Sequence, residues 1–131
     1  MKKTGILNSD ISKVISELGH TDTIVICDSG LPIPAHVKRI DLALKQGVPS
    51  FMDCLATVLQ EMQVEQAFVA LEMGEKSPGL RKEMESVLEE VTVQAISHEE
   101  FKALTHKAKA IIRTGEFTPY ANVILQAGVI F

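Results

Sequence analysis

The chain contains few of the motifs on which common enzyme and metal sites depend. It has no Walker loop, no GxGxxG or GxSxG sequence, and no His or Cys pair at metal-ligand spacing. Its two cysteines, Cys27 and Cys54, lie in apolar runs without CxxC spacing, so we expect both to be buried small side chains. These absences favour chemistry that needs no metal, nucleotide or other cofactor.

Basic residues and long apolar runs are also scarce. The 13 Lys and Arg residues against 17 Asp and Glu residues give a formal net charge of −4 at pH 7. No basic stripe is interleaved with aromatic residues, so nucleic acid is not an expected partner. No apolar run is long enough to span a membrane, and Asn8, Ser9 and Asp10 interrupt the start of the chain before it could form a signal peptide. We therefore expect no membrane association and a cytoplasmic location.

Apolar residues, in contrast, are plentiful. They make up 46% of the chain, which is high for a length of 131 residues because a small protein has a large surface for its volume. The length fits one domain, covering residues 1–131. The apolar excess is explained either by the core alone or by surface buried between subunits, and we favour the second explanation.

Helix and strand patterns alternate along the chain. The apolar, β-branched run at residues 23–27 predicts a strand buried on both faces. Apolar spacing predicts helices that begin after Ser9, Ser50 and Ser97, the last with a Ser97–Glu100 capping box. A charged helix is expected at residues 80–90, and further strands are expected at residues 37–44, 67–73, 91–96 and 108–112. This alternation predicts a single three-layer α/β/α domain with a mixed sheet, in which residues 74–79 form a mobile loop.

The last nineteen residues place a polar loop before an apolar strand that reaches Phe131. An apolar terminus exposes costly surface unless it enters a sheet or a subunit contact, so we expect it to be held in place. The loop before it, residues 114–122, offers hydroxyls and an amide rather than a cluster of charges. This chemistry suits a neutral polyol.

Two histidines lie at helix ends of opposite polarity. His20 follows Gly19 at the carboxyl end of the first expected helix, where the dipole favours the charged imidazolium. It is either a general acid or a surface histidine that complements the dipole. His98 is the first residue after the Ser97 cap, where the dipole disfavours the charged form, so a neutral His98 could bind a hydroxyl. The two histidines form either an acid and base pair or two separate structural groups.

Asp28 and Lys102 are the other candidate site residues. Asp28 ends the strand at residues 23–27, and ligands of open α/β sheets lie at the carboxyl ends of strands. Asp28 either binds a ligand or caps its own turn. Lys102 lies one helical turn after His98, so the two could address one ligand, although Lys102 is otherwise an ordinary solvated lysine. We assign no function to His36 or His106.

Four segments carry a specific resemblance to a known family. They are residues 2–22 (KKTGILNSDISKVISELGHTD), 24–34 (IVICDSGLPIP), 97–102 (SHEEFK) and 111–131 (IIRTGEFTPYANVILQAGVIF). With these segments the chain resembles the ribose pyranase and fucose mutarotase family. Residues 60–94 add little to the resemblance.

The resemblance implies an isomerase that interconverts the pyranose and furanose forms of free D-ribose, ahead of phosphorylation by ribokinase. It implies that His20 is the proton donor and that Asp28, His98 and the segment Tyr120, Ala121 and Asn122 bind the sugar, with Lys102 as a further contact. It also implies a ring-shaped homo-oligomer, a decamer or octamer, with sites near subunit interfaces. L-fucose mutarotase activity, or a non-catalytic sugar-binding role in ribose uptake, remains the alternative.

The spacing of His20 and Asp28 bears on how such a site is built. An extended path between them spans roughly 25 Å, because a strand rises about 3.3 Å per residue. One pentose cannot bridge that distance. Either the turn at Thr21 and Asp22 folds His20 back along the strand, or neighbouring subunits contribute different members of one site, and we favour a shared site. The identity of the general base stays open between His98 and Asp28.

Overall fold

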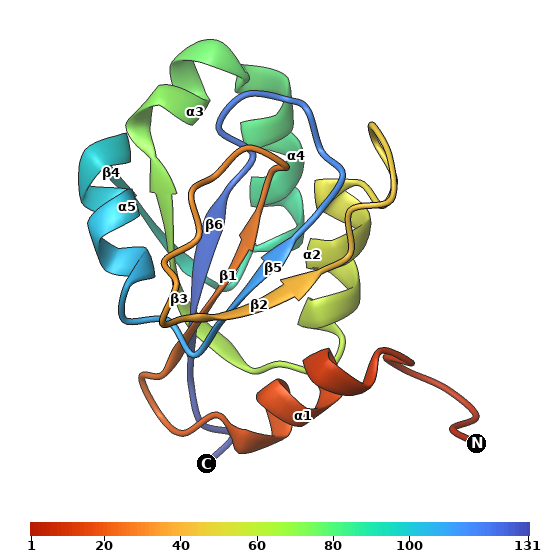
Figure 1. Cartoon of the computed structure of the whole chain (residues 1–131). Coiled ribbons are helices and arrows are strands. Elements are labelled where there is room, and N and C mark those ends of the chain that lie inside the picture. The colour runs from red at the N-terminus through yellow and green to blue at the C-terminus, as the bar shows by residue number, and fades with distance from the viewer.

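A six-stranded mixed sheet forms the centre of the protein (Figure 1). The computed structural model describes all residues from 1 to 131. Across the sheet the strands lie in the order β2 (Lys38–Asp41), β5 (Ala110–Arg113), β1 (Thr23–Cys27), β6 (Val123–Ala127), β3 (Val64–Ala70) and β4 (Thr92–Ile96). Strand β6 is antiparallel to both of its neighbours, and every other pair is parallel. The sequence prediction of one α/β domain with a mixed sheet is therefore confirmed.

Five helices surround the sheet. They are α1 (Ser9–Glu17), α2 (Phe51–Leu59), α3 (Leu71–Lys76), α4 (Pro78–Val87) and α5 (His98–Thr105). Ser50 and Ser97 cap α2 and α5 as expected, because each hydroxyl accepts a hydrogen bond from the main chain three residues later. The expected cap of α1 is wrong by one residue, since Asn8 and not Ser9 accepts the bond from the Ile11 N–H. None of the five helices has the length and apolar character needed to cross a membrane.

Alternating side chains of β1 divide the core into two parts. Ile24 and Ile26 belong to the larger cluster, which includes residues of α1, α2 and α4, whereas Val25 and Cys27 belong to a second cluster with Phe101 of α5. Successive side chains of a strand point to opposite faces, so the two clusters lie on opposite faces of the sheet. The second face is covered by a single helix and the loop at residues 31–37, and the fold is three-layered with one thin layer.

The segment after β3 differs from the sequence prediction. A strand was expected at residues 67–73, but β3 ends at Ala70 and α3 begins at Leu71. A continuous apolar run has no periodicity that separates a strand from a short helix, which explains the error. The expected mobile loop at residues 74–79 contains the end of α3 and the start of α4, and the buried Ser77 hydroxyl donates to the Pro119 carbonyl over 2.7 Å.

The apolar carboxyl terminus also differs from the prediction. Strand β6 ends at Ala127, and Val129, Ile130 and Phe131 are 38%, 87% and 100% exposed. The last main-chain bond to this segment is from the Gly128 N–H to the Gln63 carbonyl, after which no strand of this chain continues beside it. The apolar end therefore enters the sheet as far as Ala127, whereas residues 129–131 do not. A subunit contact is the other way in which this surface can be covered.

The sheet has two distinct edges at the ends of its strands. The carboxyl edge is the end at which β1 and β5 finish and β6 begins, and the amino edge is the end at which β1 begins and β6 finishes. In Figure 1 the loop before β6 crosses the top of the sheet, while the turn between α1 and β1 and the chain's carboxyl terminus lie at the bottom. Residues of the two edges are therefore separated by the length of β1.

Candidate functional site

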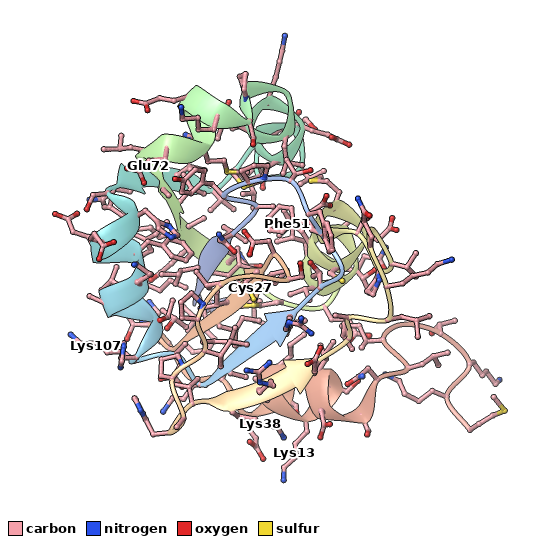
Figure 2. All side chains as sticks on the ribbon, turned by 45° about the horizontal axis from the view of Figure 1, so that its top comes forward. Lys13, Cys27, Lys38, Phe51, Glu72 and Lys107 are labelled. Carbon is pink, nitrogen blue, oxygen red and sulfur yellow. The ribbon has the colours of Figure 1, made fainter.

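Several chain segments meet at the carboxyl edge. Residues 28–31 leave β1, residues 114–122 lead into β6, and α3 and α5 begin directly after β3 and close behind β4. Figure 2 brings this edge forward, with Cys27 near its centre and Glu72 of α3 above it. These segments carry five of the seven candidate residues, namely Asp28, His98, Tyr120, Ala121 and Asn122.

Asp28 and Asn122 hold each other across the edge. The Asn122 side-chain oxygen accepts the Asp28 main-chain N–H over 2.9 Å, and the Asn122 Nδ2 donates to Asp28 Oδ2 over 3.1 Å. The other Asp28 oxygen accepts the Gly30 N–H over 2.9 Å. Asn122 is 1% exposed, so this amide is fixed in position. Asp28 thus both closes its own turn and presents a carboxyl group at the edge.

Burial sets the protonation chemistry of Asp28. Removal from water raises the pKa of this carboxyl above its ordinary value of 3.8, against the opposing hydrogen bonds from Gly30 and Asn122. A carboxyl group whose pKa lies above its usual range accepts protons more readily. Asp28 is therefore suited to the role of a general base.

His98 has an unused ring nitrogen beside this pair. Its Nδ1 is buried and has no hydrogen-bond partner, whereas nearly all buried polar atoms have one. The ring is held from two sides, since it stacks near Phe101 and meets the edge of the Tyr120 ring at a centroid distance of 5.0 Å. The His98 main-chain N–H donates to Glu72 Oε2 over 2.8 Å. A fixed imidazole with a free nitrogen is ready to bind a polar group of a ligand.

The segment from Tyr120 to Asn122 has an unusual backbone. Tyr120 has φ of +61°, a left-handed conformation that costs a non-glycine residue roughly 1 kcal/mol or more. The Asn122 N–H donates to the Tyr120 carbonyl over 2.8 Å, and Ala121 is fully buried in the core. Ala121 therefore sets the spacing that places Tyr120 beside His98 and Asn122 beside Asp28.

The rest of the polar loop has structural roles, which corrects the expectation that the whole loop faces a polyol. The Thr114 hydroxyl is buried and donates to the Cys27 carbonyl over 2.7 Å. Glu116 accepts the Phe51 N–H at the start of α2 over 3.0 Å and the Thr118 hydroxyl over 2.8 Å. Because these groups are hydrogen-bonded within the protein, they are not free to bind a ligand as the sequence had suggested.

Lys102 lies one turn beyond His98 on α5, as the spacing predicts. Its Nζ forms an ion pair with Glu99 Oε1 at 2.7 Å. Lys102 makes no hydrogen bond to Asp28, Tyr120 or Asn122, so the structure does not draw it into the cluster at the carboxyl edge.

His20 lies at the amino edge, away from the other candidate residues. Its imidazole is 53% exposed, and its Nε2 lies 3.0 Å from Glu65 Oε2 and 3.2 Å from Glu65 Oε1. The five residues of β1 separate His20 from Asp28, a strand length of about 16 Å. The turn at Thr21 therefore does not fold His20 back toward Asp28 within one chain.

Sequence reasoning missed three polar residues near the candidates: two that contact them directly, and Gln126, which contacts one of these two. Glu65 and Gln126 accompany His20, and Glu72 holds the start of the His98 helix. Gln126 is flanked by Leu125 and Ala127 in an apolar strand, which is a weak sequence signal, whereas Glu65 is followed by another polar residue and gives no such signal. No sequence signal distinguishes Glu72, since it lies in a segment that looked like a strand.

An apolar cleft of about 230 Å³ lies elsewhere, between the amino-terminal segment and α2. Its walls include Leu7, Ile11 and Val58, and it contains none of the candidate residues. The polar cluster at the carboxyl edge is the better candidate site, because a buried imidazole nitrogen and a half-buried carboxyl group converge there.

Comparison with known proteins decides the family. The model of the RbsD / FucU transport protein family matches residues 1–130. The chain belongs to this family. The D-ribose pyranases of Bacillus subtilis (strain 168) and Bacillus cereus (strain B4264) are 54% and 59% identical to it over 131 residues, which is the full length of each protein.

Two solved structures of the family extend this likeness to the fold. The structure of Bacillus subtilis RbsD complexed with D-ribose superposes with a TM-score of 0.97 at 54% identity and covers 100% of both chains. The fucose mutarotase of Streptococcus pneumoniae in complex with L-fucose gives a TM-score of 0.80 at 26% identity over 95% of each chain. The ribose-complexed relative is much the nearer of the two.

Proposed function

We propose that this family member is an isomerase that interconverts the pyranose and furanose forms of free D-ribose. The observation that carries the proposal is the buried, unpartnered Nδ1 of His98, held beside Tyr120 and close to the Asp28–Asn122 pair. A small sugar offers hydroxyls to all of these groups. The similarity to D-ribose pyranases over the full chain supports ribose as the substrate.

The reaction requires two proton transfers at each ring opening and closing. A base takes the proton of the anomeric hydroxyl, an acid gives a proton to the ring oxygen, and the bond from that oxygen to the anomeric carbon breaks to leave an open aldehyde. The chain then rotates, and the 4-hydroxyl instead of the 5-hydroxyl attacks the aldehyde carbon. General acid-base catalysis of this kind supplies typically 10²- to 10⁴-fold.

We assign these roles to residues of both sheet edges. His20 is the acid that protonates the ring oxygen, and Asp28 or His98 is the base. Asp28, His98, Tyr120 and Asn122 hold the sugar at the carboxyl edge, with Ala121 as the spacer and Lys102 as an outer contact. No metal or other cofactor enters these steps.

The separation of the edges means that one chain does not complete the site. The length of β1, about 16 Å, lies between His20 and Asp28. We propose that the amino edge of one subunit meets the carboxyl edge of its neighbour, so that each site takes His20 from a second copy. A contact of this head-to-tail type repeats from copy to copy and closes into a ring when the rotation allows.

The exposed apolar groups fit such an assembly. Ile130 and Phe131 lie beyond the amino edge, where they are almost fully exposed in the single chain, and Phe117 in the loop at the carboxyl edge is 59% exposed. Burial of these groups between copies would remove costly apolar surface. A ring-shaped decamer or octamer, and a cytoplasmic location, remain predictions.

Exchange between ribopyranose and ribofuranose signals, measured by NMR with and without the protein, tests the function. We expect the protein to accelerate this exchange, and to act more weakly when L-fucose replaces ribose. Faster exchange for L-fucose than for ribose would favour the fucose mutarotase alternative. Ribose binding without any accelerated exchange would make the protein a sugar-binding accessory and exclude the isomerase.

A further inference from the structure

Glu65 is the closest charged group to His20. Both carboxylate oxygens of Glu65 lie within hydrogen-bond distance of His20 Nε2, at 3.0 and 3.2 Å. Gln126 of β6 donates its side-chain N–H to Glu65 Oε1 over 2.8 Å. The three side chains come from the α1–β1 turn, β3 and β6. They form a chain of hydrogen bonds from the Gln126 amide through the Glu65 carboxylate to the His20 imidazole.

The backbone aims Glu65 at this position. The pairing of β3 with β6 is irregular between Val64 and Gln66, so the residue between them is displaced from the regular ladder. Bulges of this type re-aim a side chain next to active sites. Gly128 follows β6 at the same place, and a Cβ atom built on it would lie 3.1 Å from the Glu65 Cβ. The absence of a side chain at Gly128 leaves room for Glu65.

Other charged groups near His20 are engaged elsewhere. Asp22 Oδ2 accepts the Gly19 N–H over 2.9 Å, and Asp22 Oδ1 lies 3.7 Å from Lys109 Nζ. The hydrogen bond from Gln126, followed by the one from His20, lowers the pKa of the Glu65 carboxyl below its ordinary value of 4.5. Glu65 is therefore the ionised acceptor for the imidazole at neutral pH.

We propose that Glu65, held by Gln126, is the positioning residue of the proton donor. It keeps the Nε2–H of His20 engaged and thereby directs the opposite nitrogen, Nδ1, to the substrate as the atom that gives and regains the proton. A carboxylate that fixes the tautomer and orientation of a catalytic histidine is a known arrangement in enzymes. This inference rests on the proposed role of His20 in ring opening.

The first test compares Glu65→Ala, Glu65→Gln and the control Glu83→Gln, which removes an exposed carboxylate on α4. We expect Glu65→Ala to lower kcat roughly threefold to tenfold with KM changed less than about twofold, because the ion pair is open to solvent and Glu65 does not touch the sugar. Glu65→Gln keeps an acceptor for Nε2–H and should retain more activity than Glu65→Ala. Wild-type kcat in Glu65→Ala would overturn the inference.

The second test uses the His20→Ala background and the ring nitrogens themselves. In that background Glu65→Ala should change kcat less than about twofold, because its effect passes through His20. At a pH high enough to make His20 neutral, imidazole ¹⁵N spectra of the intact protein should show the remaining ring proton on Nε2, and a mixture of both tautomers in Glu65→Ala. An undiminished loss in the His20→Ala background would make Glu65 a structural residue.

The two proposals fail in different ways. Full exchange activity in His20→Ala would overturn the donor role of His20, and the positioning role would fall with it. Loss of exchange in His20→Ala, together with unchanged kcat and an unchanged ¹⁵N spectrum in Glu65→Ala, would overturn the positioning role alone.

Discussion

Each edge of the sheet carries a carboxylate held by a side-chain amide, at one edge from the residue just before β6 and at the other from β6 itself. At the carboxyl edge Asn122 binds Asp28, and at the amino edge Gln126 binds Glu65. In the first pair Asn122 is buried and Asp28 is half-buried, and this burial raises the pKa of Asp28, whereas the Glu65 side chain is 38% exposed and its hydrogen bonds lower its pKa. A carboxylate bound by an amide is thus a readier proton acceptor at one edge, in Asp28, and is ionised at neutral pH at the other, in Glu65.

Under the proposed function, this difference separates sugar binding from proton donation. The buried pair, with the fixed His98 ring, provides a rigid surface that is ready for a ligand. The exposed pair holds an imidazole that stays open to solvent until another surface covers it. Strand β6 and the residue before it therefore support both groups of candidate residues, but keep these groups apart in a single chain.

The largest expected effect comes from the amino edge. His20→Ala should lower kcat by about 10²- to 10⁴-fold, because the proton donor to the ring oxygen is lost. Ribose affinity should stay within about threefold, since the sugar is held at the other edge. Exchange NMR gives the rate and calorimetric titration gives the affinity. Loss of binding together with exchange would place His20 among the binding groups.

The next effect distinguishes the two amides. Asn122→Ala should lower the free energy of unfolding by about 1–3 kcal/mol, because it removes the partners of the Asp28 N–H and of Asp28 Oδ2, while Oδ1 keeps the Gly30 N–H. Gln126→Ala should cost less than about 0.5 kcal/mol, since its group is partly open to water. Urea unfolding measures both values. Equal losses would mean that the edges do not differ in burial as described.

The pH dependence of stability should have opposite signs at the two carboxylates. Folded Asp28 keeps its proton at pH values where the unfolded chain has lost it, so its contribution to stability falls as pH rises from about 4 through the raised pKa. Glu65 has a lowered pKa, so its contribution is present above the ordinary value of 4.5 and is lost as pH falls through the lowered one.

Unfolding free energies from pH 3 to 7 test these signs. Relative to Asp28→Asn, the wild type should lose stability as pH rises, and relative to Glu65→Gln it should gain stability. Carboxyl ¹³C titration of the two residues gives the pKa directions directly. A lowered pKa for Asp28 would contradict the dominance of burial at that edge.

The smallest effect is expected at Lys102. Because its ammonium group pairs with Glu99, Lys102→Met should change the KM for ribose by less than about twofold. The activity of Glu99→Gln provides the control for loss of the ion pair alone. A tenfold rise in KM for Lys102→Met, but not for Glu99→Gln, would show that Lys102 reaches the sugar.

The sequence predicted best where local signals agree. The β-branched run of β1 and the serine caps of α2 and α5 gave these elements nearly to the residue. The position of β6 between β1 and β3 could not be predicted in this way, because the pairing of strands distant in sequence leaves no signal in the local sequence. The helix that begins at Leu71 was missed because its apolar residues continue the run of β3 and looked like part of a strand.

The candidate residues came from the sequence and their roles remain predictions, whereas their arrangement came from the structure. Asp28 and His98 meet at one edge because parallel strands bring their carboxyl ends together, which a topology argument anticipates. Tyr120 joins them because the loop after β5 leads into the antiparallel strand β6 at the same edge. The sequence could not show that the side chains of Thr114 and Glu116 form hydrogen bonds with the main chain. Nor could it show that an irregularity in β3 directs Glu65 toward His20. Those contacts depend on the packed structure.

Subunit mixing tests most directly whether the two edges of different subunits form one site. His20→Ala and Tyr120→Phe subunits, each nearly inactive alone, are unfolded, mixed in equal amounts and reassembled, with mixed assembly confirmed by native mass spectrometry. A shared site predicts recovery of roughly one quarter of the wild-type exchange rate, because one site in four then receives both intact edges. Confirmed mixed assemblies with no recovered exchange would contradict a shared site.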